Sequence, residues 1–146
     1  MKYALIGCGR IATNHVKAAL NNGLDFVAAC DILPEKAEQL LAAHDIQNDT
    51  SIKCYGDYRE MLAENPELEL VAIATESGKH ATIALDCIDA GANVIIEKPM
   101  AMSIADADEI IRRAERGGGV VSACHQNRFN VAIQRMRAAL EEGRFG

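Results

Sequence analysis

The chain has 146 residues, of which 49% are hydrophobic and 25% charged, and its formal net charge is −6 at pH 7. This length supports one domain with a hydrophobic core and is too short for most two-domain arrangements. The composition is that of an ordinary globular protein, so extensive disorder is not expected. With 21 acidic residues against 15 basic ones and no Lys/Arg cluster, neither nucleic acid nor a membrane is an expected partner.

The cysteines and the amino terminus bear on location and metal content. No apolar run is long enough to span a bilayer, and the chain enters a strand-like run at once, without a signal-peptide pattern. His44 and His125 have no metal-ligand spacing with any cysteine or histidine, so no metal is expected. The cysteines lie far apart, without a C-x-x-C pair, at positions Cys8, Cys30, Cys54, Cys87 and Cys124. We expect buried, reduced thiols in a cytoplasmic protein.

Six apolar runs alternate with segments of helical periodicity. Such alternation predicts an α/β fold with a doubly wound, mostly parallel sheet and helices on both faces. Near-continuous apolar runs are typical of strands that are covered on both sides. The six predicted strands are Tyr3–Ile6, Phe26–Cys30, Ile52–Tyr55, Leu68–Ala74, Asn93–Ile96 and Val120–Cys124.

Several helix boundaries can be read directly. Pro34 opens a helix after the second strand, at a position that proline favours. Asp57 and Ser103 each precede a helical segment as N-cap residues, and the helix after Ser103 is expected to run to about Glu115, before three consecutive glycines.

The first strand leads into a G-x-G-x-x-A loop that opens a helix. Gly7 permits the tight turn, Gly9 lets the backbone approach phosphates, and Ala12 keeps the helix close to the sheet. Arg10 and Ile11 lie in the same loop, where free N–H groups and the positive helix end face a bound pyrophosphate. The loop therefore predicts a dinucleotide site.

Asp31 strengthens this prediction. It ends the second apolar run, at the distance from the glycines where a carboxylate binds the adenosine ribose hydroxyls. The plainer alternative is a glycine turn with an exposed aspartate. Neither Ile32 nor Leu33 offers a basic group for a 2′-phosphate, which favours NAD over NADP. Lys36, one helical turn further, leaves NADP open.

Two polar loops follow the fourth and fifth strands. The first runs from Thr75 to His80, and the second holds Glu97, Lys98 and Pro99. Because proline biases the preceding residue away from helical geometry, Lys98 is held at the strand end, where it can act as a general base beside a nicotinamide. A solvated surface lysine before a turn proline is the alternative.

The segment after the sixth strand faces the same edge of the sheet. Gln126 and Asn127 are candidates for binding the nicotinamide carboxamide or the substrate. Arg128 either meets an anionic substrate group or closes a surface salt bridge. His15, on the first helix, is interpreted as a packed structural histidine because that helix is pressed against the sheet.

In this order and spacing, these motifs resemble the N-terminal domain of the Gfo/Idh/MocA (glucose–fructose oxidoreductase / inositol dehydrogenase) family, over the whole chain. The Glu-Lys-Pro sequence is the most specific element. The resemblance implies a Rossmann fold, Lys98 as the catalytic residue and its bond to proline often cis. It also implies a nicotinamide-ribose contact for His80, and cofactor contacts for Thr75, Ser77, Glu97 and Lys98.

Departures from the commoner family motifs point to one branch. The loop Thr75–His80, the segment Gln126–Arg128 and the ending Glu142–Gly146 resemble UDP-N-acetylglucosaminuronate 3-dehydrogenases of bacterial surface-polysaccharide synthesis. This implies hydride transfer from C3 of a UDP-N-acetylamino-sugar uronate to NAD. The alternatives are an inositol, polyol or other sugar dehydrogenase, and a non-catalytic NAD-sensing module.

The resemblance also implies a domain division. Residues 1–125 are expected to form the Rossmann domain, and residues 126–146 a hinge segment and the start of a missing C-terminal substrate domain. The last helix agrees, because its apolar stripe of Ile133, Met136 and Leu140 has no evident partner. We therefore expect this chain to bind cofactor and to be inactive alone, and the full-length protein to be a homo-oligomer.

Overall fold

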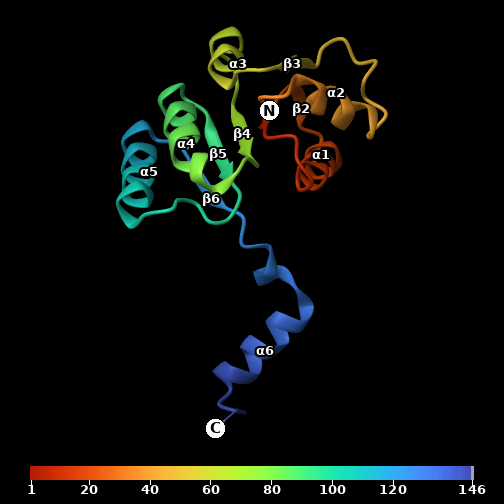
Figure 1. Ribbon diagram of the computed structural model, residues 1–146. Helices are drawn as coiled ribbons and strands as arrows, with labels where there is room; N and C mark the ends of the chain where they lie inside the picture. Colours follow the sequence, from red (N-terminus) through yellow and green to blue (C-terminus); the bar gives the residue numbers. More distant parts are fainter. Residues whose placement is uncertain (146) are drawn as a thin grey trace.

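The centre of the molecule is a six-stranded sheet, seen in a computed structural model that describes residues 1–145 (Figure 1). All strand pairs are parallel, and the strand order is β3-β2-β1-β4-β5-β6. The chain order reverses between β1 and β4, which makes that edge the expected ligand crevice. The strands are β1 (Lys2–Ile6), β2 (Asp25–Cys30), β3 (Lys53–Tyr55), β4 (Leu70–Ile73), β5 (Asn93–Ile96) and β6 (Val121–Ala123).

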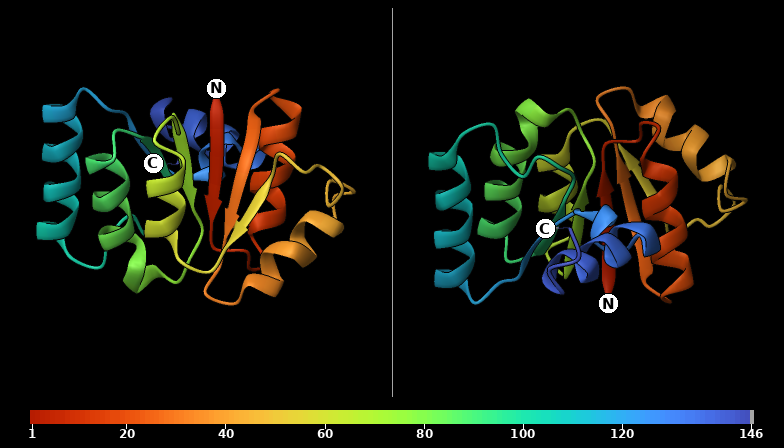
Figure 2. Two further views of the ribbon diagram at one scale, coloured as in Figure 1. Left: turned by 90° about the horizontal axis from the view of Figure 1, so that it is seen from above. Right: turned by 90° about the horizontal axis from the view of Figure 1, so that it is seen from below.

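Helices cover both faces of the sheet, which confirms the doubly wound α/β prediction (Figure 2). On one face lie α1 (Ala12–Asn21) and α2 (Pro34–Ala42). On the other lie α3 (Tyr58–Glu64), α4 (His80–Asp89) and α5 (Ile104–Gly117). Two short 3-10 helices, η1 (Ser77–Lys79) and η2 (Gln126–Phe129), and a final helix, α6 (Val131–Glu141), complete the chain.

The core has two layers because neighbouring strand residues point to opposite faces. In β1, Tyr3 and Leu5 join the cluster under α1 and α2, whereas Ala4 and Ile6 join the cluster under the other three helices. Full burial of a side chain such as that of Leu5, which is 0% exposed, contributes about 1.5–3 kcal/mol. The central strands β1, β2 and β4 are therefore buried on both sides, as the sequence predicts, whereas the edge strands β3 and β6 are not.

The predicted caps are confirmed. The Asp57 carboxylate accepts a hydrogen bond from the Arg59 N–H at 2.8 Å, and the Ser103 hydroxyl oxygen accepts one from the Asp106 N–H at 3.1 Å. Pro34 is the first residue of α2. The helix after Ser103 continues to Gly117, two residues beyond the expected end.

The last helix stands away from the sheet (Figure 1). Its apolar stripe is exposed: Ile133 is 42%, Met136 57% and Leu140 65% accessible. Within residues 1–145 the stripe is therefore unpartnered, as expected.

All five cysteines are free thiols. Cys8, Cys30 and Cys87 are buried, as predicted, whereas Cys54 and Cys124 are only partly buried. Burial is the main cause that raises the pKa of each of the three buried thiols to about 12, so they stay protonated at neutral pH. None of the helices in the described part of the chain is long and apolar enough to cross a membrane.

Candidate cofactor and catalytic site

The glycine loop joins β1 to α1 and crosses the end of β4. Gly7 has φ +95°, and a Cβ atom there would lie 2.6 Å from the Ala74 carbonyl carbon and oxygen. Only glycine fits this position. A Cβ on Gly9 would meet nothing within 4 Å, so open space lies beside the loop where the sequence predicts phosphates. Ala12 is fully buried at the start of α1.

Asp31 is held against the glycine loop. Its Oδ2 accepts a hydrogen bond from the Cys8 N–H at 2.9 Å, and its Oδ1 accepts one from the Leu33 N–H at 3.1 Å. Two backbone donors thus fix the carboxylate at the end of β2. Charge-assisted bonds of this kind are among the stronger ones in proteins.

A cavity of about 510 Å³ opens beside these groups. Gly7, Gly9, Asp31 and Thr75 line it, so the structure brings together four of the predicted cofactor residues. The volume is in the range of ligand pockets. The open backbone at Gly9 and the fixed carboxylate of Asp31 fit a dinucleotide.

Sequence reasoning missed part of the lining of this cavity. Tyr58, Arg59, Lys79 and Thr82 also line it, and the Arg59 guanidinium carbon lies 4.7 Å from the centre of the Tyr58 ring. No motif marks these residues. Their place just after β3 and β4 is the one available signal, because ligands lie at the carboxyl ends of such strands.

Lys98 belongs to a second cavity, of about 250 Å³. Gln126 and Asn127 line the same cavity, together with Arg128. Lys98 itself is exposed, and its peptide bond to Pro99 is cis. The predicted site residues therefore divide between two cavities, one at the glycine loop and one at the end of β5. The remaining predicted residues line neither: Arg10, Ile11, Ala12, Ser77, His80 and Glu97.

The buried side chain of His80 contacts both of the polar loops that follow β4 and β5. It is 1% exposed, its Nδ1 lies 2.7 Å from the Pro99 carbonyl oxygen, and its Nε2 lies 3.1 Å from the Thr75 carbonyl oxygen. Both ring nitrogens are thus engaged by backbone. His80 supports the loops and lines neither cavity, and its contact with the nicotinamide ribose stays a prediction.

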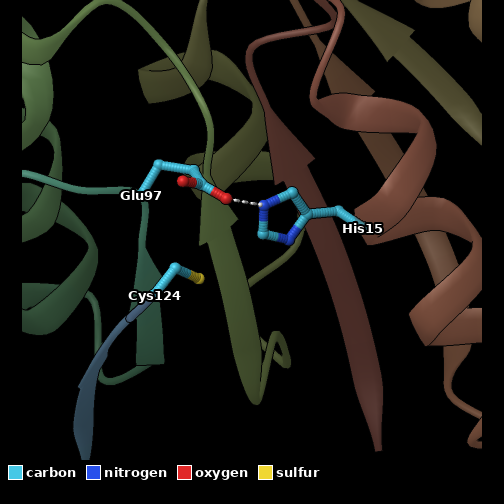
Figure 3. A group of neighbouring side chains, drawn as sticks. All are labelled: His15, Glu97 and Cys124. Carbon is cyan, nitrogen blue, oxygen red and sulfur yellow. Dashed lines mark hydrogen bonds and ion pairs between the residues drawn. The ribbon is translucent and has the colours of Figure 1, made fainter. Parts of the chain in front are cut away.

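Glu97 also lies beneath the surface, in a group with His15 and Cys124 (Figure 3). His15 Nε2 is 3.0 Å from Glu97 Oε1, and both side chains are 11% exposed. His15 is packed as expected, but its partner 82 residues away was not foreseen. Burial and the negative charge of Glu97 raise the pKa of Cys124 to about 11.

The parallel sheet with its reversal between β1 and β4, the glycine loop and Asp31 define a dinucleotide-binding Rossmann domain. A family model described as "Oxidoreductase family, NAD-binding Rossmann fold" matches residues 1–125. The chain therefore belongs to the Gfo/Idh/MocA oxidoreductase family, and the predicted family and NAD cofactor are confirmed.

Relatives of known name are dehydrogenases. D-apiose dehydrogenase of Paraburkholderia graminis is 35% identical over 147 residues, which cover 99% of this chain and 37% of that protein. Inositol 2-dehydrogenase of Salmonella typhimurium is 26% identical, covering 100% of this chain and 43% of that protein. The chain spans about two fifths of the length of these relatives.

Solved structures of dehydrogenases also superpose on this chain. The WlbA dehydrogenase from Bordetella pertussis, crystallised with NADH and UDP-GlcNAcA, superposes with a TM-score of 0.86 at 33% identity. The match covers 99% of this chain and 43% of that one. WlbA from Chromobacterium violaceum, in complex with the same two ligands, gives a TM-score of 0.82 at 32% identity over 100% of this chain and 41% of that one.

Proposed function

We propose that this chain is the NAD-binding part of a dehydrogenase that oxidises a sugar hydroxyl, with a UDP-linked N-acetylamino-sugar uronate, oxidised at C3, as its substrate. One observation carries the proposal: Lys98, Gln126 and Asn127 line one cavity at the carboxyl end of the sheet. The WlbA structures support the substrate class, because they hold NADH and UDP-GlcNAcA on the same fold.

In the proposed reaction each residue has a separate task. Bound NAD would supply the acceptor for the hydride that leaves the substrate carbon. Lys98 takes the proton of the hydroxyl on that carbon, so a carbonyl forms and a protonated lysine results. Gln126 and Asn127 orient the reacting groups through their amides. Asp31 and the glycine loop hold the cofactor in register, and positioning of this kind lowers the entropic part of the barrier.

Two buried residues keep Lys98 in place. The Lys98 N–H donates to Glu97 Oε2 at 3.4 Å, and the His80 ring lies against the Pro99 carbonyl. Both contacts act on the backbone that flanks the lysine. We therefore assign Glu97 and His80 as positioning residues.

Arg128 favours an acidic substrate over a neutral polyol. It lines the Lys98 cavity, and no ion pair engages it within residues 1–145. Its guanidinium is therefore available for a carboxylate or phosphate, which it binds through paired hydrogen bonds. An inositol or other polyol dehydrogenase remains the second candidate, supported by the inositol 2-dehydrogenase relatives.

A domain exchange tests the proposal. Residues 1–146 replace the matching segment of Bordetella pertussis WlbA, and NADH formation is followed with UDP-GlcNAcA and with inositol. We expect turnover that requires the UDP-sugar, and a fall of roughly 10²–10⁴-fold in Lys98→Met. The affinity for NAD should not change in that variant.

The matched control is Lys53→Met, because Lys53 is exposed on β3 and pairs with Glu64, far along the chain from either loop. It should leave turnover unchanged. Full turnover in Lys98→Met, or a chimera that binds NAD and the UDP-sugar without reacting, would contradict the proposal.

A further inference from the structure

Three side chains with metal-binding chemistry converge at the ends of β5 and β6 (Figure 3). His15 comes from α1, Glu97 follows β5, and Cys124 follows β6. Their ligand atoms, one nitrogen, one oxygen and one sulfur, all lie within 4.8 Å of one another. No sequence spacing reveals this group, because its members come from three separate segments.

We propose that His15, Glu97 and Cys124 form a binding site for a divalent cation of the zinc class, with three protein ligands and a fourth position open to water. Zinc binds sulfur at about 2.3 Å and nitrogen or oxygen at about 2.0–2.2 Å, so tetrahedral ligands lie about 3.6 Å apart. His15 Nε2 and Glu97 Oε1 are at 3.0 Å, already inside that spacing. Side-chain movements of about 1 Å are enough to bring all three atoms onto one ion.

The ligand set selects the metal. Calcium and magnesium take oxygen ligands, whereas imidazole and thiolate favour zinc and similar transition metals. The His15 and Glu97 side chains are each 11% exposed, so an ion held there loses most of its water. A carboxylate and a thiolate together neutralise its two positive charges.

A bound metal ion must compete with protons for the ligand atoms of this site. Burial and the charge of Glu97 raise the pKa of Cys124 to about 11, so the metal must displace the thiol proton. The titratable groups that act on the thiol or share the site with it are Glu97, His15 and Tyr3, whose own pKa is raised by burial and by Cys124.

The Tyr3 hydroxyl is a buried polar atom whose pKa is raised by burial and, to a smaller extent, by Cys124 and Cys8. Among the described residues, the Tyr3 hydroxyl is buried without a hydrogen-bond partner. Buried hydroxyls normally find one.

Cobalt(II) is the direct probe, because it replaces zinc and absorbs light. The 146-residue chain, reduced and freed of metal, is titrated with Co²⁺ and then with Zn²⁺. We expect one equivalent to bind with a thiolate-to-cobalt charge-transfer band, which Zn²⁺ then abolishes. Cys124→Ser should remove the band, and His15→Gln should weaken Zn²⁺ binding at least about tenfold.

Cys54→Ser is the matched control, since Cys54 is also a partly buried thiol but belongs to no such group among the described residues. It should bind Co²⁺ like the unchanged chain, and NAD titration confirms that each variant is folded. Absence of the charge-transfer band in the unchanged chain would overturn the proposal. So would equal Zn²⁺ affinity in the unchanged chain, Cys124→Ser and His15→Gln.

Discussion

The two cavities differ in how they are built. The glycine-loop cavity, of about 510 Å³, rests on buried strand ends and on backbone contacts such as those of Gly7 and Asp31. The Lys98 cavity, of about 250 Å³, is lined by exposed residues of η2 and by Ile133 of α6. The sheet by itself therefore forms the glycine-loop cavity, whereas the Lys98 cavity, the proposed reactive end, depends on η2 and α6, and α6 makes its main contacts with η2.

The largest effect on the glycine-loop cavity is expected from a substitution at Gly7. In Gly7→Ala the backbone at φ +95° is strained by about 1–3 kcal/mol, and the new methyl group meets β4 backbone at 2.6 Å. We expect a clear loss in the free energy of unfolding, measured with urea, and no detectable NAD binding by calorimetry.

Gly9→Ala is the matched control for Gly7→Ala. Its methyl group enters open space, so the free energy of unfolding should change by less than about 1 kcal/mol. NAD affinity should still fall, because the methyl group occupies room that the phosphates need. Normal stability and binding in Gly7→Ala would refute the close-approach argument.

A smaller effect is expected at Asp31. Asp31→Asn removes a charged acceptor for the ribose hydroxyls, and such a hydrogen bond contributes about 1.5–3 kcal/mol. NAD affinity should fall roughly ten- to a hundredfold in a calorimetric titration. Asp25→Asn, at the exposed opposite end of β2, should leave it unchanged. Equal affinities in both variants would remove Asp31 from the site.

Alkaline pH tests how firmly the nucleotide region is packed. The pKa of the Cys30 thiol is raised to about 12, above its unfolded value of about 8.5. The unfolded chain then loses this proton first, so stability is intact below about pH 8.5 and falls as the pH rises toward 12. Urea unfolding should show this slope, and Cys30→Ala should reduce it by up to about 1.4 kcal/mol per pH unit. An unchanged slope would contradict the assigned burial.

The smallest effect is expected from removing α6. Its apolar stripe is exposed, and the helix makes its main contacts with η2. A chain of residues 1–130 should keep its unfolding free energy within about 0.5 kcal/mol and its NAD affinity. A large loss of stability would show that α6 packs on the sheet after all.

Local sequence patterns determine the strands, the helix caps and the glycine loop of this protein. The six strands, the caps at Asp57 and Ser103 and the glycine loop follow from apolar periodicity and from residues with particular backbone preferences. The place of Lys98 at the end of β5 follows in the same way. Each of these depends on a few consecutive residues, so the sequence alone carries the signal.

The tertiary structure decided how those pieces meet. Because β1 lies beside β4, Gly7 contacts Ala74 across 67 positions of the sequence, and His80 reaches both Thr75 and Pro99. The cluster of His15, Glu97 and Cys124 exists for the same reason. Contacts between distant segments depend on strand order and helix packing, and no local pattern encodes them.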